Sequence, residues 1–352
     1  MLISIFRSFF LTAIAFIVSA CSSSSSESNS NSAILGVTLS TDGNTLYVAN
    51  AYKQVIQSLN LNTLTVSTYA GGAYTAGTTN GNGTAARFNQ PYQIANIAGA
   101  LFVVDTYNHG IRKIDVSQVV TTLAGTLQTA GDADGTGTVA RFYYPKGITN
   151  VGTDLYVADT DNFLIRRVTS AGVVTAFAGS SGSDGYVDGS SGVKFGCPVA
   201  VAANTTYVFV SDSCNNSIRS VKISDGTVTT VAGSTSGTTG TTDSPGTLAR
   251  FNKPAGIVSD GANTLYVADS VNHAIRKIDL TTTPATVTTI AGVAGSAGSA
   301  DGTGTTTAKF NTPFGLALDA ANGILYVSDQ NYTKIRKVVL ATGLVTTLNA
   351  SF

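Results

Sequence analysis

The phrase LYVAN at residues 46–50 recurs five more times along the chain with small changes. The later copies are LFVVD (101–105), LYVAD (155–159), VFVSD (208–212), LYVAD (265–269) and LYVSD (325–329). Successive copies are roughly 55 residues apart, and a steady period of this size is typical of a repeat architecture. The sequence therefore predicts six sibling units.

Each unit contains four short runs rich in Val, Ile, Thr and aromatic residues, which are bounded by turn-forming residues and have the length of β-strands. In the third unit these runs are GIT (147–149), LYVAD (155–159), LIRRVT (164–169) and VVTAFAG (173–179). Four strands per repeat is the pattern of a β-propeller blade. We expect an all-β fold, a closed six-bladed β-propeller of four-stranded antiparallel blades. Small residues suit the crowded first strands near the axis, and Gln93 is the exception among Gly36, Gly147, Ala200, Gly256 and Gly315.

A tag of the form F-x-x-P stands directly before five of the first strands. The tags are AARFNQP (85–91), VARFYYP (139–145), GVKFGCP (192–198), LARFNKP (248–254) and TAKFNTP (307–313). The Pro restricts the chain to an extended entry into the next strand. We expect the Phe of each tag to fill the space between two adjacent blades.

These features together resemble the NHL-repeat family of six-bladed propellers, over residues 33–352. The tag, the phrase L-Y-V-A-D and the following N-H-x-I-R-K carry the resemblance, with Asn108-His109 and Asn272-His273 at the pair that names the family. We align the other units at this pair as follows: Tyr52-Lys53, Asn162-Phe163, Asn216-Ser217 and Asn331-Tyr332. Some NHL domains bind RNA on a basic face. This chain has 20 basic and 20 acidic residues and only 11% charged residues, so nothing predicts a nucleic-acid partner.

The N-terminus has the features of an export signal. Residues 1–20 hold Arg7 and an apolar run, and V-S-A-C resembles a bacterial lipobox in which Cys21 would be lipidated. An ordinary signal peptide with an incidental Cys is the alternative. Residues 21–32 form a Ser- and Asn-rich tether. We expect a lipid anchor at Cys21 in the cell envelope, and the resemblance of Ser22 to a sorting residue implies the outer membrane.

The two remaining cysteines are Cys197 and Cys214. Cys197 stands at the start of a first strand and Cys214 just after the end of the second strand of the same hairpin. Folding the hairpin near residues 204–205 places them opposite each other, as it does Tyr144 with Asp161 in the preceding unit. We expect a disulfide, which an exported protein permits.

Five of the six phrases end in Asp, and an Arg follows seven residues later. The pairs are Asp105–Arg112, Asp159–Arg166, Asp212–Arg219, Asp269–Arg276 and Asp329–Arg336. The first unit has Asn50 and Gln57 instead, so both charges are lost together, as a structural ion pair requires. The long connections hold further acids, and GDADGTG (131–137) only superficially resembles a calcium loop, because Tyr143 replaces the acid at position twelve. We expect no catalytic residue, no metal site and no cofactor.

Aromatic and His side chains fall on the connections expected to share one face of the ring, the loop-rich face. The ligand-face candidates are Tyr52, Tyr107, His109, Phe163, Tyr186, His273 and Tyr332. Tyr143 and Tyr144 are as readily explained by covering a blade junction. The sequence favours a monomeric, non-enzymatic, membrane-anchored extracytoplasmic scaffold that binds a protein or a glycan. The alternative is a metal-dependent hydrolase or lyase with its site at the channel mouth, since fold does not decide function.

Overall fold

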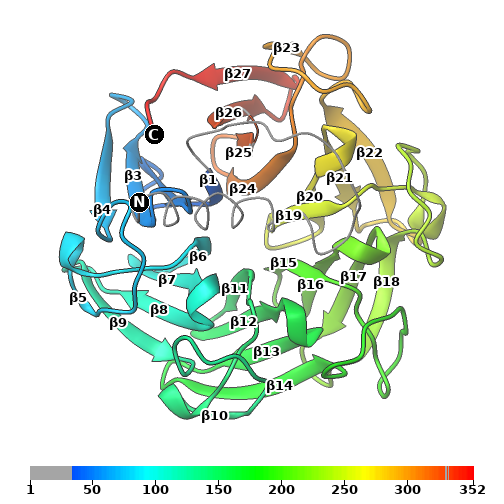
Figure 1. The fold of residues 1–352 in the computed structure, drawn as a ribbon. Helices are drawn as coiled ribbons and strands as arrows, with labels where there is room; N and C mark the ends of the chain where they lie inside the picture. Colours follow the sequence, from blue (N-terminus) through cyan, green and yellow to red (C-terminus); the bar gives the residue numbers. More distant parts are fainter. Residues whose placement is uncertain (1–33, 330, 332) are drawn as a thin grey trace, which may run out of the picture. The chain divides into compact units, whose positions relative to one another are not determined.

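The computed structural model describes residues 34–329, 331 and 333–352. It shows six antiparallel sheets arranged around one axis, as Figure 1 makes clear. The innermost strands are β1 (Ile34–Leu39), β6 (Pro91–Ile97), β11 (Gly147–Val151), β15 (Pro198–Ala203), β19 (Pro254–Ser259) and β24 (Pro313–Asp319). Each innermost strand contacts the next, and β24 contacts β1. The ring is closed, and the six-bladed propeller is confirmed.

The other strands follow outward in chain order within each blade. The second strands are β2 (Thr45–Asn50), β7 (Ala100–Asp105), β12 (Asp154–Asp159), β16 (Tyr207–Asp212), β20 (Thr264–Asp269) and β25 (Ile324–Asp329). The third strands are β3 (Val55–Asn60), β8 (Gly110–Ile114), β13 (Leu164–Val168), β17 (Ser217–Lys222), β21 (Ala274–Asp279) and β26 (Lys334–Val339). The fourth strands are β4 (Val66–Ala70), β9 (Val119–Ala124), β14 (Val173–Gly179), β18 (Val228–Gly233), β22 (Thr286–Ala291) and β27 (Leu344–Leu348).

Every blade has the four expected strands, and blades 2, 3 and 6 add a short fifth strand. Two-residue strands from the long connections, β5 (Gly81–Asn82), β10 (Gly135–Thr136) and β23 (Gly302–Thr303), pair with β9, β14 and β27. Each lies on the outer edge of its sheet, where a fourth strand would otherwise leave backbone groups unpaired. Two residues are too few to show a strand pattern in the sequence.

The axis is crowded at the level of the first-strand glycines. A Cβ added at Gly36, Gly256 or Gly315 would overlap a backbone carbonyl oxygen of the neighbouring innermost strand. Below this level lies a cavity of about 370 Å³, which all six innermost strands line with uncharged side chains. The small residues therefore allow the innermost strands to approach, as the sequence predicts.

The tag phenylalanines fill the spaces between blades. All five of them, Phe88, Phe142, Phe195, Phe251 and Phe310, are fully buried. Phe142, for example, packs with Val104 and Ile111 of blade 2 and with Val157 of blade 3. This confirms the expected role of the tag, and each Phe joins the cores of two neighbouring blades.

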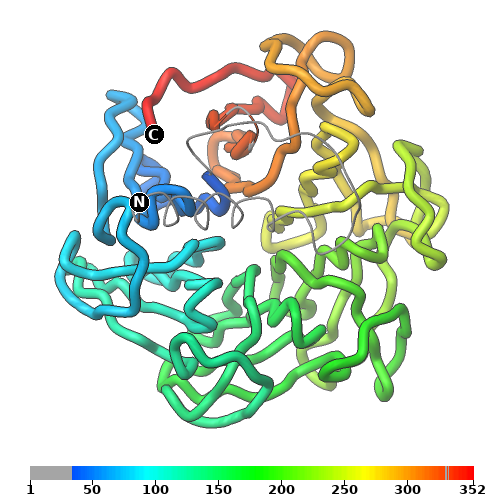
Figure 2. The backbone as a smooth tube through the Cα atoms, viewed as in Figure 1, coloured from blue at the N-terminus to red at the C-terminus, as the bar shows by residue number. Residues whose placement is uncertain are grey.

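The ring closes between blades 6 and 1 without exchange of a strand. Figure 2 shows the end of the chain returning to the first blade. Ala350 packs in one apolar cluster with Ile34 and Leu46 of blade 1 and with Tyr326 of blade 6. The Ser328 hydroxyl also donates to the Leu35 carbonyl at 2.7 Å. Side-chain packing and this hydrogen bond therefore hold the closure.

Candidate functional site

The Asp and Arg of each phrase form a buried ion pair across the turn between the second and third strands. The Asp105 and Arg112 side chains are fully buried and 2.8 Å apart, and four other blades repeat the pair at 2.7–3.1 Å. In blade 1 the Asn50 amide donates to Gln57 Oε1 at 2.9 Å. The predicted structural ion pair is confirmed, and its neutral counterpart in blade 1 keeps the same contact.

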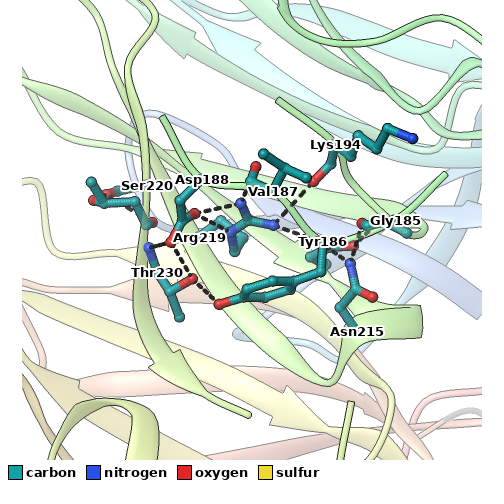
Figure 3. A network of polar contacts seen from close by, with 12 residues as sticks. Gly185, Tyr186, Val187, Asp188, Lys194, Asn215, Arg219, Ser220 and Thr230 are labelled. Carbon is teal, nitrogen blue, oxygen red and sulfur yellow. Dashed lines mark hydrogen bonds and ion pairs between the residues drawn. The ribbon is translucent and has the colours of Figure 1, made fainter. Parts of the chain in front are cut away.

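Each of these buried Arg residues also reaches an acceptor in the long connection before its blade. Arg166 pairs with Asp134 at 2.7 Å, and Asp188, Asp243 and Asp301 take the same place in the next three blades. Figure 3 shows the example at Arg219, which binds Asp188 and lies over the Tyr186 ring. The connection acids thus hold the loops to the blades. Among the described residues, no three His, Cys, Asp or Glu side chains gather as a metal site.

Within the described part of the chain, three-residue 3-10 turns follow the Asp of the repeated phrase in blades 2 to 5, and they define the pair that resembles Asn-His. Asn108, Asn162, Asn215 and Asn272 each donate to the preceding Asp at 2.7–2.8 Å. The residue after each Asn has left-handed backbone angles, as do Gln54 and Thr333. The left-handed residue is the fourth after the Asp, or after Asn50 in blade 1. The sequence-based alignment at residues 52–53, 216–217 and 331–332 is therefore wrong by one residue. The pair in blade 4 is Asn215-Asn216.

The left-handed residue connects one blade to the next. His109 Nδ1 accepts from the Tyr144 backbone N–H at 3.1 Å, and His273 Nδ1 accepts from that of Thr312 at 3.1 Å. Asn216 and Gln54 use amide oxygens in the same way, toward Lys253 and Gln90. Burial lowers the pKa of both His side chains. The neutral imidazole is the form that can accept this hydrogen bond.

Cys197 and Cys214 form the predicted disulfide, with their Cα atoms 5.1 Å apart. It joins the entry of β15 to the turn after β16. The hairpin register drawn from the sequence is confirmed. Tyr144 and Asp161 hold the equivalent positions in blade 3.

The structure brings together only some of the ligand-face candidates. Tyr107 and His109 both contact Tyr144, with ring centroids 4.9 and 4.6 Å from it. Tyr52 forms a separate edge-to-face pair with Tyr74. Tyr186 packs on Arg219, as noted above, and Phe163 and His273 occupy the left-handed positions of blades 3 and 5. Tyr332 and Cys21 lie outside the described residues, and contact of any candidate with a ligand stays a prediction.

A cluster on blades 2 and 3 stands where the innermost strands begin, at the end of the ring that carries the 3-10 turns. We call it the channel mouth and define it as Tyr92, Tyr107, Tyr144, Lys146 and Asp161. The Lys146 ammonium lies 5.9 Å from the centre of the Tyr92 ring. The Tyr92 ring meets Phe314 of blade 6 edge-on at 5.3 Å and is only 5% exposed, so it forms the floor of the mouth.

Lys146 and Asp161 differ from every charged pair described above. Both side chains are half-buried. Neither has a hydrogen bond or ion pair with another residue that the structure describes, although each lies close enough to affect the titration of the other. Burial of a charge without a bonded partner has a desolvation cost, and here the opposite charge offsets it only in part. These two side chains are therefore available to an external molecule.

The electrostatics of the mouth follow from burial. Burial lowers the pKa of the Lys146 ammonium and raises the pKa of the Asp161 carboxyl, and each charge partly offsets the shift of the other. Burial also raises the pKa of Tyr107 and Tyr144, which keeps their phenols protonated. Burial likewise raises the pKa of Asp105, against the opposing effect of Arg112.

The sequence analysis did not identify Tyr92, Lys146 or Asp161 as site residues. The available clue was an exception in the repeat. Of the five residues that directly follow the Pro of a tag, only Lys146 is charged. Of the residues two positions after the end of the repeated phrase, only Asp161 is charged. The pairing of β11 with β12 brings these two exceptions together.

Comparisons with known proteins agree with this fold. The family model for the NHL repeat matches residues 251–278. NHL repeat-containing protein 2 of Bos taurus is 29% identical over 297 residues, which are 73% of this chain and 40% of that protein. This chain therefore spans less than half the length of that relative. It contains an NHL repeat within a six-bladed propeller.

Two solved structures share the fold at low sequence identity. An auxiliary nutrient binding protein from Bacteroides thetaiotaomicron has a TM-score of 0.64 and 16% identity, over 90% of this chain and 69% of the other. Virginiamycin B lyase from Staphylococcus aureus has a TM-score of 0.53 and 14% identity, over 91% and 85% of the two chains. At these identities the likeness concerns the fold alone.

Proposed function

We propose that this NHL-repeat propeller is a non-enzymatic binding scaffold, anchored to the cell envelope through Cys21, that presents its loop-rich face to a protein or glycan. The channel mouth carries the proposal. Its two opposite charges, Lys146 and Asp161, have no bonded partner among the described residues, whereas the Asp and Arg of the buried pairs bind each other. Ligand sites typically contain a small number of polar groups that fix the orientation of the ligand.

The surroundings of these charges support a binding role. Tyr107 and Tyr144 form an edge-to-face pair beside them, and Tyr143 next to Tyr144 is 39% exposed. Tyr side chains provide contact area at a small entropic cost and end in a polar group. The name of the Bacteroides thetaiotaomicron neighbour, an auxiliary nutrient binding protein, supports a binding role for this fold.

The anchor rests on the sequence alone, through V-S-A-C and the tether after it. No helix of the described residues is long and apolar enough to cross a membrane. Replacement of Cys21 by Ser should move the protein from the membrane fraction to the soluble extracytoplasmic fraction. Retention of the C21S protein in the membrane fraction would show that another feature holds it there.

Capture of a partner tests the binding role. The tagged full chain should retain an envelope component, and Tyr107→Ala with Lys146→Met should lose it. Lys277→Met is the matched control, because Lys277 lies in β21, away from the mouth. Capture that survives both mouth substitutions would contradict the proposal. A tightly held stoichiometric metal ion in the purified protein would instead favour the hydrolase or lyase alternative.

A further inference from the structure

We infer that the channel mouth binds a neutral sugar ring, through Lys146 and Asp161 together and against the Tyr side chains. The inference rests on the proposed function and narrows the partner to a glycan. Four steps lead to it: the charge balance of the mouth, its hydrogen-bonding capacity, its aromatic surfaces and its position on the axis.

The charge balance limits the net charge of the ligand. Lys146 and Asp161 carry opposite charges within one cluster, and each affects the titration of the other. A ligand with a single negative charge would be attracted by Lys146 and repelled by Asp161. A cation would be attracted by Asp161 and repelled by Lys146. The mouth therefore suits a ligand with no charge or with both charges.

Hydrogen-bonding capacity favours the uncharged ligand. The ammonium only donates and the carboxylate only accepts, whereas a hydroxyl does both. Two neighbouring hydroxyls of a sugar could accept from Lys146 and donate to Asp161, which makes two charge-assisted hydrogen bonds. A zwitterion such as a free amino acid would have to lose the hydration of two more charges to occupy the same place.

The aromatic residues provide the apolar surface that the carbon-bound hydrogens of a sugar ring require. Tyr107 and Tyr144 stand beside the charges, and the phenol pKa of both is raised, so their hydroxyls stay available as donors. The His109 hydrogen bond to the Tyr144 backbone fixes this residue in place. Aromatic rings with a polar end combine both kinds of contact in one side chain.

The mouth lies where the innermost strands crowd the axis. Tyr92 and Phe314 meet edge-on at the floor, just above the level at which the first-strand glycines bring the innermost strands together. On the other side of blade 3, the disulfide of blade 4 takes the position equivalent to Tyr144 and Asp161. We expect the mouth to hold one sugar ring, at the end or side of a chain.

The test uses the full chain and isothermal titration calorimetry with neutral oligomers of glucose, mannose, galactose, xylose and N-acetylglucosamine. At least one oligomer should bind. Its affinity should fall at least tenfold in Lys146→Met and in Asp161→Asn, since each loses a charge-assisted hydrogen bond. It should change less than about twofold in Lys277→Met, a substitution outside the mouth. A second measurement, the thermal unfolding of each variant, confirms that the loss is not one of folding.

Three results would overturn the inference: no oligomer binds, an oligomer binds equally well to both mouth variants, or a dipeptide such as Gly-Ala binds in place of the sugars. If no sugar binds but capture from the envelope still depends on Lys146, only the sugar inference fails. If capture is also unaffected by the mouth substitutions, the proposed function fails with it.

Discussion

Blade 3 contains two pairs of oppositely charged residues: one pair holds the blade together, and we assign the other to binding. Asp159 and Arg166 are fully buried, 2.8 Å apart, and the same pair recurs in four other blades. Lys146 and Asp161 are half-buried, have no bonded partner among the described residues, and stand at positions where no other repeat has a charge. Repetition therefore distinguishes the charges that hold the blades from the charges that we assign to binding.

Blade 1 shows that the repeated pair is needed for its contact and not for its charge. Asn50 and Gln57 replace the Asp and Arg, and they keep the hydrogen bond across the turn at 2.9 Å. A buried ion pair can be exchanged as a unit at little cost, whereas loss of one partner leaves the other charge unpaired. Two mouth positions are also exchanged together: in blade 4, Cys197 and Cys214 stand at the positions that Tyr144 and Asp161 occupy in blade 3.

Removal of one partner of the repeated pair should have the largest effect. Arg166→Met leaves the Asp159 carboxylate buried without its cation, and we expect the free energy of unfolding to fall by about 3–5 kcal/mol in urea. The double variant Asp159→Asn with Arg166→Gln, which copies blade 1, should lose clearly less than Arg166→Met. Equal losses in the two would contradict the role of blade 1 as a neutral equivalent.

Removal of the disulfide should have the next largest effect. Cys197→Ser with Cys214→Ser opens a loop between residues separated by 17 positions, and we expect a loss of about 3 kcal/mol. The urea midpoint of the oxidised protein should fall to that of the double variant on addition of a reductant. A midpoint that does not respond to the reductant would show that the disulfide adds little to stability.

The His contacts between blades should give a smaller, pH-dependent effect. The pKa of His109 and His273 is lowered from 6.5 in the folded protein, so their contribution is present above pH 6.5 and lost as the pH falls below it. The loss should be about 1 kcal/mol for each hydrogen bond. Unfolding at pH 7.5 and 5.5 measures it.

The control for this effect is His109→Asn with His273→Asn, which keeps an acceptor of the kind that Asn216 provides. The difference between wild type and this variant isolates the His contribution. The buried Asp carboxyls, whose pKa is raised, make both proteins more stable as the pH falls, which is opposite to the effect of the His residues. A pH dependence that is the same in wild type and variant would contradict the assignment.

The fold could be predicted from the sequence because the same strand and turn pattern recurs in all six repeats. The loss of Asp and Arg together at Asn50 and Gln57 identified the ion pair, and the hairpin register identified the disulfide. The register of the 3-10 turn was misjudged by one residue in three blades, because the pair was not counted from the Asp. In blade 4 the adjacent Asn215 and Asn216 could each fill the motif. The spacing from Asp212 and the left-handed backbone of Asn216 both assign Asn215 as the first residue of the pair.

The candidate site was harder to predict, because the residues that we assign to binding stand at positions where the other repeats have different residue types. Aromatic residues on the connections drew attention to Tyr107 and His109, and the structure places both beside Tyr144. Lys146 and Asp161 are 15 positions apart and come together only through the pairing of β11 with β12. Their lack of bonded partners cannot be seen in a sequence.

The most direct test compares Lys146→Met with Arg166→Met in the same urea-unfolding experiment at pH 7. Removal of an unpaired, half-buried charge should leave the free energy of unfolding unchanged or slightly higher, as is common for residues kept for binding. Arg166→Met should lose about 3–5 kcal/mol, as stated above. A loss in Lys146→Met as large as that in Arg166→Met would show that Lys146 holds the fold, and it would contradict the division between repeated structural charges and a unique binding pair.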